Sequence, residues 1–187
     1  MDPKAVDDRD VNTGGTREPG ETRERTAIRS YVALGDSFTA GTGCDPGLGW
    51  ADRLARALPD GAVYRNLAKH GATSADVREQ VSEALQLEPD LVTVICGAND
   101  VLFNPRADVL TYSRNFGAIL RRIQRAVPGV RLVTATQPER WDFLPVGPRT
   151  KARLQESLRR INQATRTLAA AHGAAVLEVA SDPRLGD

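Results

Sequence analysis

The sequence predicts an α/β protein in which helices cover both faces of one parallel sheet. Five short apolar segments alternate with four helical patterns over residues 30–187. This alternation is typical of a parallel sheet, because each crossover helix packs back onto the sheet it leaves. The segments are almost continuously apolar, which suits strands buried on both faces. We therefore expect a single domain over residues 30–187.

The five expected strands are short apolar segments separated by turn residues and helical patterns. They cover residues 31–34, 62–68, 91–96, 131–135 and 174–179. The first runs directly into Gly35-Asp36-Ser37, and the third runs into Gly97-Ala98-Asn99-Asp100. Polar residues therefore follow two strands at the point where each strand ends.

The four expected helices show apolar residues at three- and four-residue spacing. Their stripes are Trp50, Leu54 and Leu58; Val77, Val81 and Leu85; Phe116, Leu120, Ile123 and Val127; and Leu154, Leu158, Ile161, Thr165 and Leu168. The first helix ends at residues 59–61 (Pro-Asp-Gly), and the third ends at Pro128-Gly129. Thr73 and Asp76 form a capping pattern at the start of the second helix.

The first 29 residues differ from the rest of the chain in composition. They hold seven acidic and six basic residues and almost no large apolar side chains. Such a segment cannot offset the entropy lost on ordering, so we expect a disordered N-terminal tail over residues 1–29. A solvated extension is favoured over a binding arm.

Composition excludes several classes of function. The chain has 25 basic and 24 acidic residues, a net charge of +1, so no field favours a nucleic-acid partner. No apolar stretch reaches the roughly 20 residues of a membrane span, and no secretory signal is visible, which predicts a cytoplasmic protein. Cys44 and Cys96 are too few for a metal site and are expected to be free thiols.

Three residues at successive strand ends match what an ester hydrolase needs. Ser37 offers a hydroxyl nucleophile where reactive groups gather in open α/β sheets. Gly71 follows the second strand and lets a backbone N–H approach a ligand closely. Asn99 follows the third strand and can donate from a neutral amide. The N–H groups of Ser37 and Gly71 and the Asn99 side chain would then bind the oxyanion formed on the attacked carbonyl.

These residues resemble the sequence blocks of the SGNH (GDSL-type) hydrolases, a family of esterases, lipases and acylhydrolases. Gly35-Asp36-Ser37 matches the first block, Gly71 the second, and Gly97-x-Asn99-Asp100 the third. The resemblance implies a flavodoxin-like α/β/α sandwich, for which we expect the strand order 2-1-3-4-5. It also implies a small-molecule ester substrate, no cofactor and no metal, with Ser37 as the nucleophile and Ser37, Gly71 and Asn99 as the oxyanion hole.

The chain departs from the family pattern near its C-terminus. The family's Asp-x-x-His block, which carries the base and its orienting acid, is not found in the sequence. We therefore expect the base and a final helix to be missing and turnover to be weak or absent. His172 should lie at the opposite end of the sheet from Ser37. His70, beside Gly71, is the better placed histidine but has no evident acid partner.

The substrate pocket is less well defined by the sequence. Asp36 and Asp100, which lie within the first and third blocks, are candidate pocket residues. Trp141 and Phe143 follow the fourth strand, where they would either wall an acyl pocket or pack their loop against the domain. Short acyl esters and acetylated sugars both stay open as substrates.

Two other classes of function are compatible with this fold. A non-catalytic module would use Ser37, Gly71 and Asn99 to bind a carbonyl group or an anion. A flavodoxin-like nucleotide binder would use the same crevice, but neither a G-x-G-x-x-G sequence nor a lysine-bearing phosphate loop is present. The G-x-S-x-G elbow of α/β-hydrolases is absent too, because Thr39 occupies the position of its last glycine.

Overall fold

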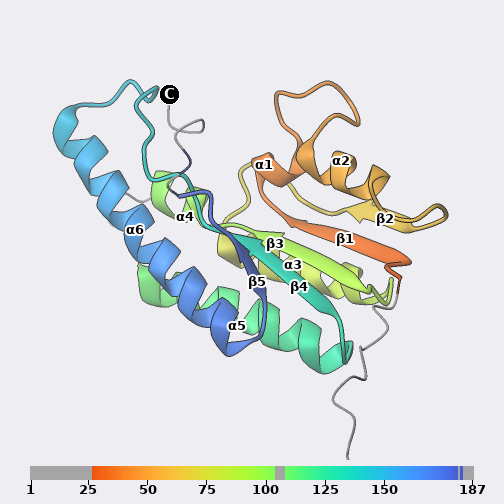
Figure 1. The fold of residues 1–187 in the computed structure, drawn as a ribbon. Helices are drawn as coiled ribbons and strands as arrows, with labels where there is room; N and C mark the ends of the chain where they lie inside the picture. The colour runs from red at the N-terminus through yellow and green to blue at the C-terminus, as the bar shows by residue number, and fades with distance from the viewer. Residues whose placement is uncertain (1–26, 104–107, 181, 183–187) are drawn as a thin grey trace, which may run out of the picture.

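Five parallel strands form one sheet in a computed structural model that describes residues 27–103, 108–180 and 182. The strand order is β2-β1-β3-β4-β5 (Figure 1), as predicted. The strands are β1 (Ser30–Gly35), β2 (Val63–Asn66), β3 (Leu91–Ile95), β4 (Arg131–Ala135) and β5 (Ala175–Leu177). Residues 1–26 of the tail predicted to be disordered lie outside the described residues.

Helices lie on both faces of the sheet, which confirms the predicted three-layer architecture. On one face lies α2 (Trp50–Arg56), and on the other lie α3 (Ser74–Leu85), α5 (Val109–Ala126) and α6 (Pro148–Ala171) (Figure 1). Within the described residues, no helix is both long enough and apolar enough to cross a membrane.

Two short helices were not predicted. α1 (Ser37–Ala40) follows β1 after one residue, and α4 (Ala98–Leu102) follows β3 after two. Helices of four and five residues are too short to show a helical period in the sequence. Both begin at the carboxyl edge of the sheet. The predicted site residues Ser37 and Asn99 therefore lie in the first turns of these two helices.

The larger part of the core lies between the sheet and α3, α5 and α6. The α5 stripe of Phe116, Leu120 and Ile123 is fully or almost fully buried there, against Val92 and Val94 of β3. The smaller part lies under α2 on the opposite face. The two layers of helices are therefore unequal, and most of the apolar burial is on the α5 side.

The two edge strands are less buried than the sequence predicted. Alternate residues of β2 are exposed, and in β5 both end residues are exposed, whereas β1 and β3 are buried almost throughout. Each edge strand has only one neighbouring strand, and the helices do not cover it on both faces. Burial on both faces holds for the central strands only.

A side-chain amide on α3 holds the end of β1. The Gly35 N–H donates to Gln80 Oε1 at 3.0 Å, and Gln80 Nε2 donates to the Gly35 carbonyl at 3.0 Å. The Gln80 side chain thus supplies both hydrogen bonds that a neighbouring strand would give. Since Gly35 lies two residues before Ser37, this contact fixes the start of the candidate site.

We expect Gln80→Ala to lower the free energy of unfolding by about 2 kcal/mol, because the buried Gly35 N–H loses its partner. The Gly35 carbonyl would keep its bond from the Lys69 N–H. Gln86→Ala, at an exposed position on the end of the same helix, is the matched control and should change stability by less than about 0.5 kcal/mol. Urea unfolding of both variants measures the difference, and equal effects would contradict the role assigned to Gln80.

Candidate active site

Ser37 lies at the first position of α1, immediately beyond β1. The Asp36 carboxylate caps this helix, with Oδ1 accepting from the Phe38 N–H at 3.0 Å, and Gly41 ends it in the left-handed region at φ 77°. The Ser37 side chain is partly exposed, and among the described residues its hydroxyl has no hydrogen-bond partner. The tight strand-to-helix turn therefore presents an unpaired hydroxyl at the carboxyl edge of the sheet.

Gly71 and Asn99 follow the strands on either side of β1. Gly71 lies in the loop after β2 with φ 76°, and Asn99 lies in α4 after β3. The buried Asn99 side chain donates from Nδ2 to the Ala72 carbonyl at 3.0 Å, which joins the two loops across the end of β1. An amide group has two hydrogens, so one N–H of Asn99 is left for a ligand.

Strand pairing brings these three segments to the same edge. Ala33 of β1 is in register with Asn66 of β2, and Gly35 is in register with Ile95 of β3. The segments carrying Ser37, Gly71 and Asn99 therefore leave the sheet side by side. The structure brings together the three positions that the sequence singled out.

The Asp100 carboxylate holds the N-terminus of α3. Its carboxylate accepts from the Ser74 N–H at 2.9 Å and from the Ser74 hydroxyl at 2.6 Å, at the N-terminus of α3. The predicted capping box of Thr73 and Asp76 is present at the same helix end. Burial raises the pKa of Asp100, and the two bonds from Ser74 oppose that rise. Asp100 thereby fixes the relative position of α4 and α3.

Asp36 is fully buried directly before the candidate nucleophile. Oδ2 of its carboxylate has no hydrogen-bond partner among the described residues. Burial raises the pKa of Asp36 from 3.8 to about 6, against the effect of the Phe38 N–H bond; the nearby Asp100 raises it further and His70 lowers it. A carboxyl whose pKa is raised by burial to about 6 therefore lies next to Ser37 in the chain.

The two histidines lie at different ends of the sheet. His70 is exposed in the loop after β2, where its Nδ1 lies 3.3 Å from the Thr42 hydroxyl. His172 ends α6 before β5, and its Nδ1 lies 2.8 Å from Gln124 Oε1. His70 is therefore at the edge that carries Ser37, and His172 is at the amino end of the strands, where the sequence placed it.

Aromatic side chains form one side of the site. Phe38, which follows Ser37, packs edge-on against Trp141 at a centroid distance of 6.3 Å, and Trp141 stacks on Phe143 at 5.6 Å. Trp141 Nε1 donates to the Pro138 carbonyl at 2.8 Å, which fixes the indole. Both aromatic residues of the β4–α6 connection thus lie on the same side as the residue after Ser37.

The two cysteines are free, as predicted. Cys44 is exposed in the loop after α1, and Cys96 is buried at the end of β3. Burial raises the pKa of the Cys96 thiol well above its ordinary value, so this thiol stays protonated at neutral pH.

The sequence also matches a known protein family. Residues 33–187 match the sequence profile of the GDSL-like Lipase/Acylhydrolase family. The chain belongs to this family. Among curated proteins, none matches the sequence.

Solved structures with the same fold include several esterases and lipases. AlinE4, an SGNH-hydrolase family esterase, has a TM-score of 0.62 at 23% identity, over 80% of this chain and 75% of its own. An extracellular lipase from Streptomyces rimosus reaches 0.65 at 24% identity, over 81% and 80%. The psychrotrophic esterase EstA from Pseudoalteromonas sp., in a structure inhibited by monoethylphosphonate, reaches 0.59 at 22% identity, over 80% and 76%. These likenesses support the fold assigned to the GDSL-family chain.

Sequence reasoning missed the residues that position the site. Gln80 lies on the buried face of α3, three residues after Val77 and one before Val81. Ser74 is buried at the start of the same helix. A polar residue within an apolar stripe is the signal that would have found Gln80, because buried polar groups are hydrogen-bonded in folded proteins.

We expect Gly97→Ala to destabilise the GDSL-family chain by about 2–5 kcal/mol. Gly97 adopts φ 122°, and a Cβ there would lie 2.9 Å from Ile161 Cγ2 and 3.0 Å from the Tyr112 ring. Gly117→Ala is the control, because a Cβ in the middle of α5 meets only the flexible end of Leu168 at 3.4 Å. It should be neutral or stabilise by up to about 1 kcal/mol. Thermal unfolding measures the change in stability of both variants. Equal changes in the two would contradict the constraint at Gly97.

The raised pKa of Asp36 predicts a pH dependence of stability. The unfolded chain releases this proton near its ordinary pKa of 3.8, whereas the folded chain holds it to about 6. Between these values the folded state binds more protons, so the free energy of unfolding falls as the pH rises, by about 3 kcal/mol in total. Asp36→Asn keeps an acceptor for the Phe38 N–H but cannot titrate. Its stability relative to wild type should therefore rise by most of that amount, about 2 kcal/mol, between pH 4 and pH 7.

Urea unfolding at a series of pH values measures this difference. Asp60→Asn removes an exposed carboxylate and controls for the change in net charge. A stability difference between Asp36→Asn and wild type that stays constant from pH 4 to pH 7 would contradict the raised pKa.

Proposed function

We propose that this chain is a serine ester hydrolase with Ser37 as its nucleophile. The observation that supports the proposal best is the unpaired Ser37 hydroxyl just beyond β1, the central of three strands, with Gly71 and Asn99 just beyond the two neighbouring strands. The match to a family of lipases and acylhydrolases agrees with it. The substrate class is a small-molecule ester.

In the proposed reaction, Ser37 Oγ attacks the ester carbonyl carbon, its hydroxyl proton passes to water, and a tetrahedral intermediate forms. The backbone N–H groups of Ser37 and Gly71 and the second N–H of Asn99 bind the oxyanion, and each such donor contributes on the order of 3 kcal/mol to stabilising the transition state. Collapse of the intermediate breaks the ester C–O bond and leaves the acyl group on Ser37, while the leaving oxygen takes a proton from water and departs as the alcohol. Water then attacks the acyl group, releases the acid and restores the hydroxyl.

Proton transfer limits the proposed reaction. His70 bonds to Thr42 and His172 bonds to Gln124, and neither hydrogen-bonds to Ser37. A serine without a base keeps a residual rate of about 10³–10⁴ over water from oxyanion binding and positioning. We therefore propose that this chain turns over esters slowly.

The alternative is a non-catalytic module of the same fold. Such a protein would use the oxyanion donors to bind a carbonyl group or an anion and would never form a covalent bond through Ser37. The absence of a base bonded to Ser37 among the described residues favours it. Covalent chemistry at Ser37 separates the two functions.

We expect a fluorophosphonate probe to label Ser37 slowly and to completion, because no base is hydrogen-bonded to the Ser37 hydroxyl within the described part of the chain. Ser37→Ala should abolish labelling, and Asn99→Ala should slow it by about 10²–10³-fold. Ser82→Ala, at an exposed serine of α3, is the matched control and should label like wild type. Mass spectrometry of the intact protein follows the reaction.

Two results would contradict this proposal in different ways. No labelling of folded protein would exclude the hydrolase and support the binding module. Rapid labelling would show that an activating base exists, and loss of the rapid phase in His70→Ala, with His172→Ala unchanged, would identify His70 as that base.

A further inference from the structure

The exposed face of α5 is strongly basic. The helix carries no acidic residue and four arginines, all of them exposed: Arg114, Arg121, Arg122 and Arg125. The last three lie within the final six residues of the helix, on one face, and we call them the arginine cluster. Like charges one helical turn apart repel each other, as Arg121 and Arg125 must. A cluster of this kind favours a partner that brings negative charge.

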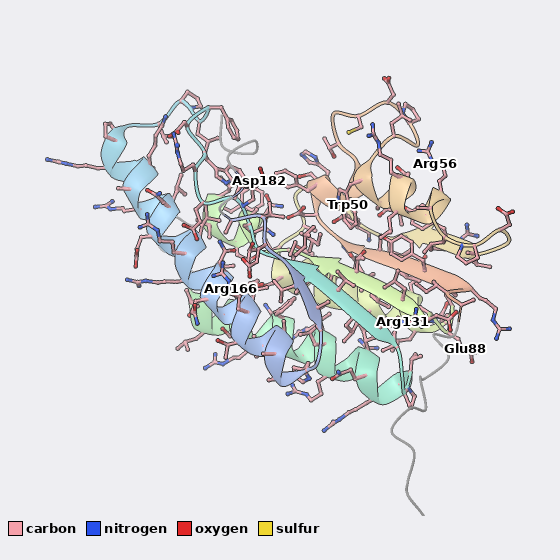
Figure 2. The ribbon with its side chains drawn as sticks, in the orientation of Figure 1. Trp50, Arg56, Glu88, Arg131, Arg166 and Asp182 are labelled. Carbon is pink, nitrogen blue, oxygen red and sulfur yellow. The ribbon has the colours of Figure 1, made fainter. Side chains whose placement is uncertain are left out.

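Arginines of the neighbouring helix α6 are neutralised, and those of α5 are not. Arg160 pairs with Glu156 at 2.9 Å. Arg166, labelled in Figure 2, pairs with Glu178 of the segment after β5 at 2.7 Å. Within the part of the chain that the structure describes, no arginine of α5 forms an ion pair. The charge of the arginine cluster is therefore available to a ligand.

A groove of about 370 Å³ lies beside the arginine cluster, between α5 and α3. Arg122 Nη2 donates to the Ser82 hydroxyl at 2.9 Å, which joins the two helices there. The described residues that line the groove include no acid; they are the arginine cluster with Leu85, Ala118 and Ala126. The groove thus has apolar side chains in its wall and guanidinium groups around it.

The arginine cluster and the candidate active site lie at opposite edges of the sheet. α5 ends at Ala126 and leads into β4, which begins at Arg131, so this end of α5 lies at the amino ends of the strands. Ser37 follows the carboxyl end of β1. A ligand in the groove would therefore not contact the proposed oxyanion donors.

We propose that the arginine cluster and the groove beside it bind an acidic segment of a partner protein, with an apolar side chain between its carboxylates. Guanidinium groups pair with carboxylates through two parallel hydrogen bonds, and arginine is enriched in protein interfaces. The apolar wall of the groove would take the apolar side chain. The inference does not depend on the proposed function, because it uses no residue of the candidate active site.

Other anionic partners match this surface less well. A membrane surface would be held more firmly by large apolar side chains that insert into it. Among the described residues of α5, the one large apolar side chain that is exposed is Leu110, at the other end of the helix. Tight binding of nucleic acid rests on many phosphate contacts, whereas the chain has a net charge of +1.

The experiment titrates the full-length chain into a fluorescein-labelled glutamate peptide with one central leucine and follows fluorescence anisotropy. It is done at about 0.1 M salt, where exposed charges more than about 10 Å apart are largely screened. Arg121→Gln combined with Arg125→Gln should weaken binding about fivefold or more. A peptide with serine in place of the leucine should bind at least about threefold more weakly, because it leaves the apolar wall uncovered.

The matched control combines Arg159→Gln with Arg160→Gln. It removes the same charge from exposed positions of α6, where Arg159 pairs with Glu139 and Arg160 with Glu156. Peptide binding should change by less than about twofold, because these charges are screened from the groove. Glutamine is a good helix former, so both double variants should fold. Asn99→Ala should bind the peptide as wild type does.

The results separate the groove from other binding sites. Equal weakening by the two double variants, or equal binding of the leucine and serine peptides, overturns the inference. Loss of peptide binding in Asn99→Ala would place the anion at the candidate active site and overturns it too. Vesicles of phosphatidylcholine with phosphatidylserine, and duplex DNA, test the other anionic partners. If either binds through Arg121 and Arg125 while the peptide does not bind, the partner is that polyanion and the inference fails.

Discussion

The carboxyl edge of the sheet depends on hydrogen bonds for backbone groups that have left the strand ladder. Parallel strands diverge there, and each buried N–H or C=O left without a partner costs about 1–3 kcal/mol. Side-chain amides supply these partners at several strand ends. Gln80 bonds to both backbone groups of Gly35, Asn162 bonds to both of Gln137, Gln137 donates to the Cys96 carbonyl, and Asn99 donates to the Ala72 carbonyl.

This arrangement couples the fold to the candidate site. The helices that cover the sheet also hold its strand ends, since Gln80 comes from α3 and Asn162 comes from α6. Ser37 lies two residues beyond a backbone unit that is held in this way. Asn99 has two roles in the proposed function, because one of its N–H groups fixes the loop of Gly71 while the other would bind the oxyanion. In the proposed function, the bond to Ala72 would thus position the Asn99 donor before any ligand arrives, which is what electrostatic stabilisation of a transition state requires.

The sequence predicted the parts of the molecule that rest on repeated local patterns. Strand order, the three layers and the capping box of Thr73 and Asp76 all follow from apolar periodicity, capping residues and the family resemblance. The contacts that hold the site were not predictable in that way, because Gln80 and Gly35 are 45 positions apart and meet only in the folded chain. The same holds for Asp36, whose pKa is raised by burial that no local pattern reveals.

The two faces of the sheet are covered unequally. On the α5 side, α3, α5 and α6 cover the central strands and hold the larger part of the core. On the other side, the short α2 packs mainly against β1 and its neighbours, and an apolar hollow opens over the strands further along the sheet (Figure 1). The polar donors of the site lie at the strand ends, and Phe38 joins them to this hollow. The polar strand ends and the apolar hollow therefore meet at Phe38.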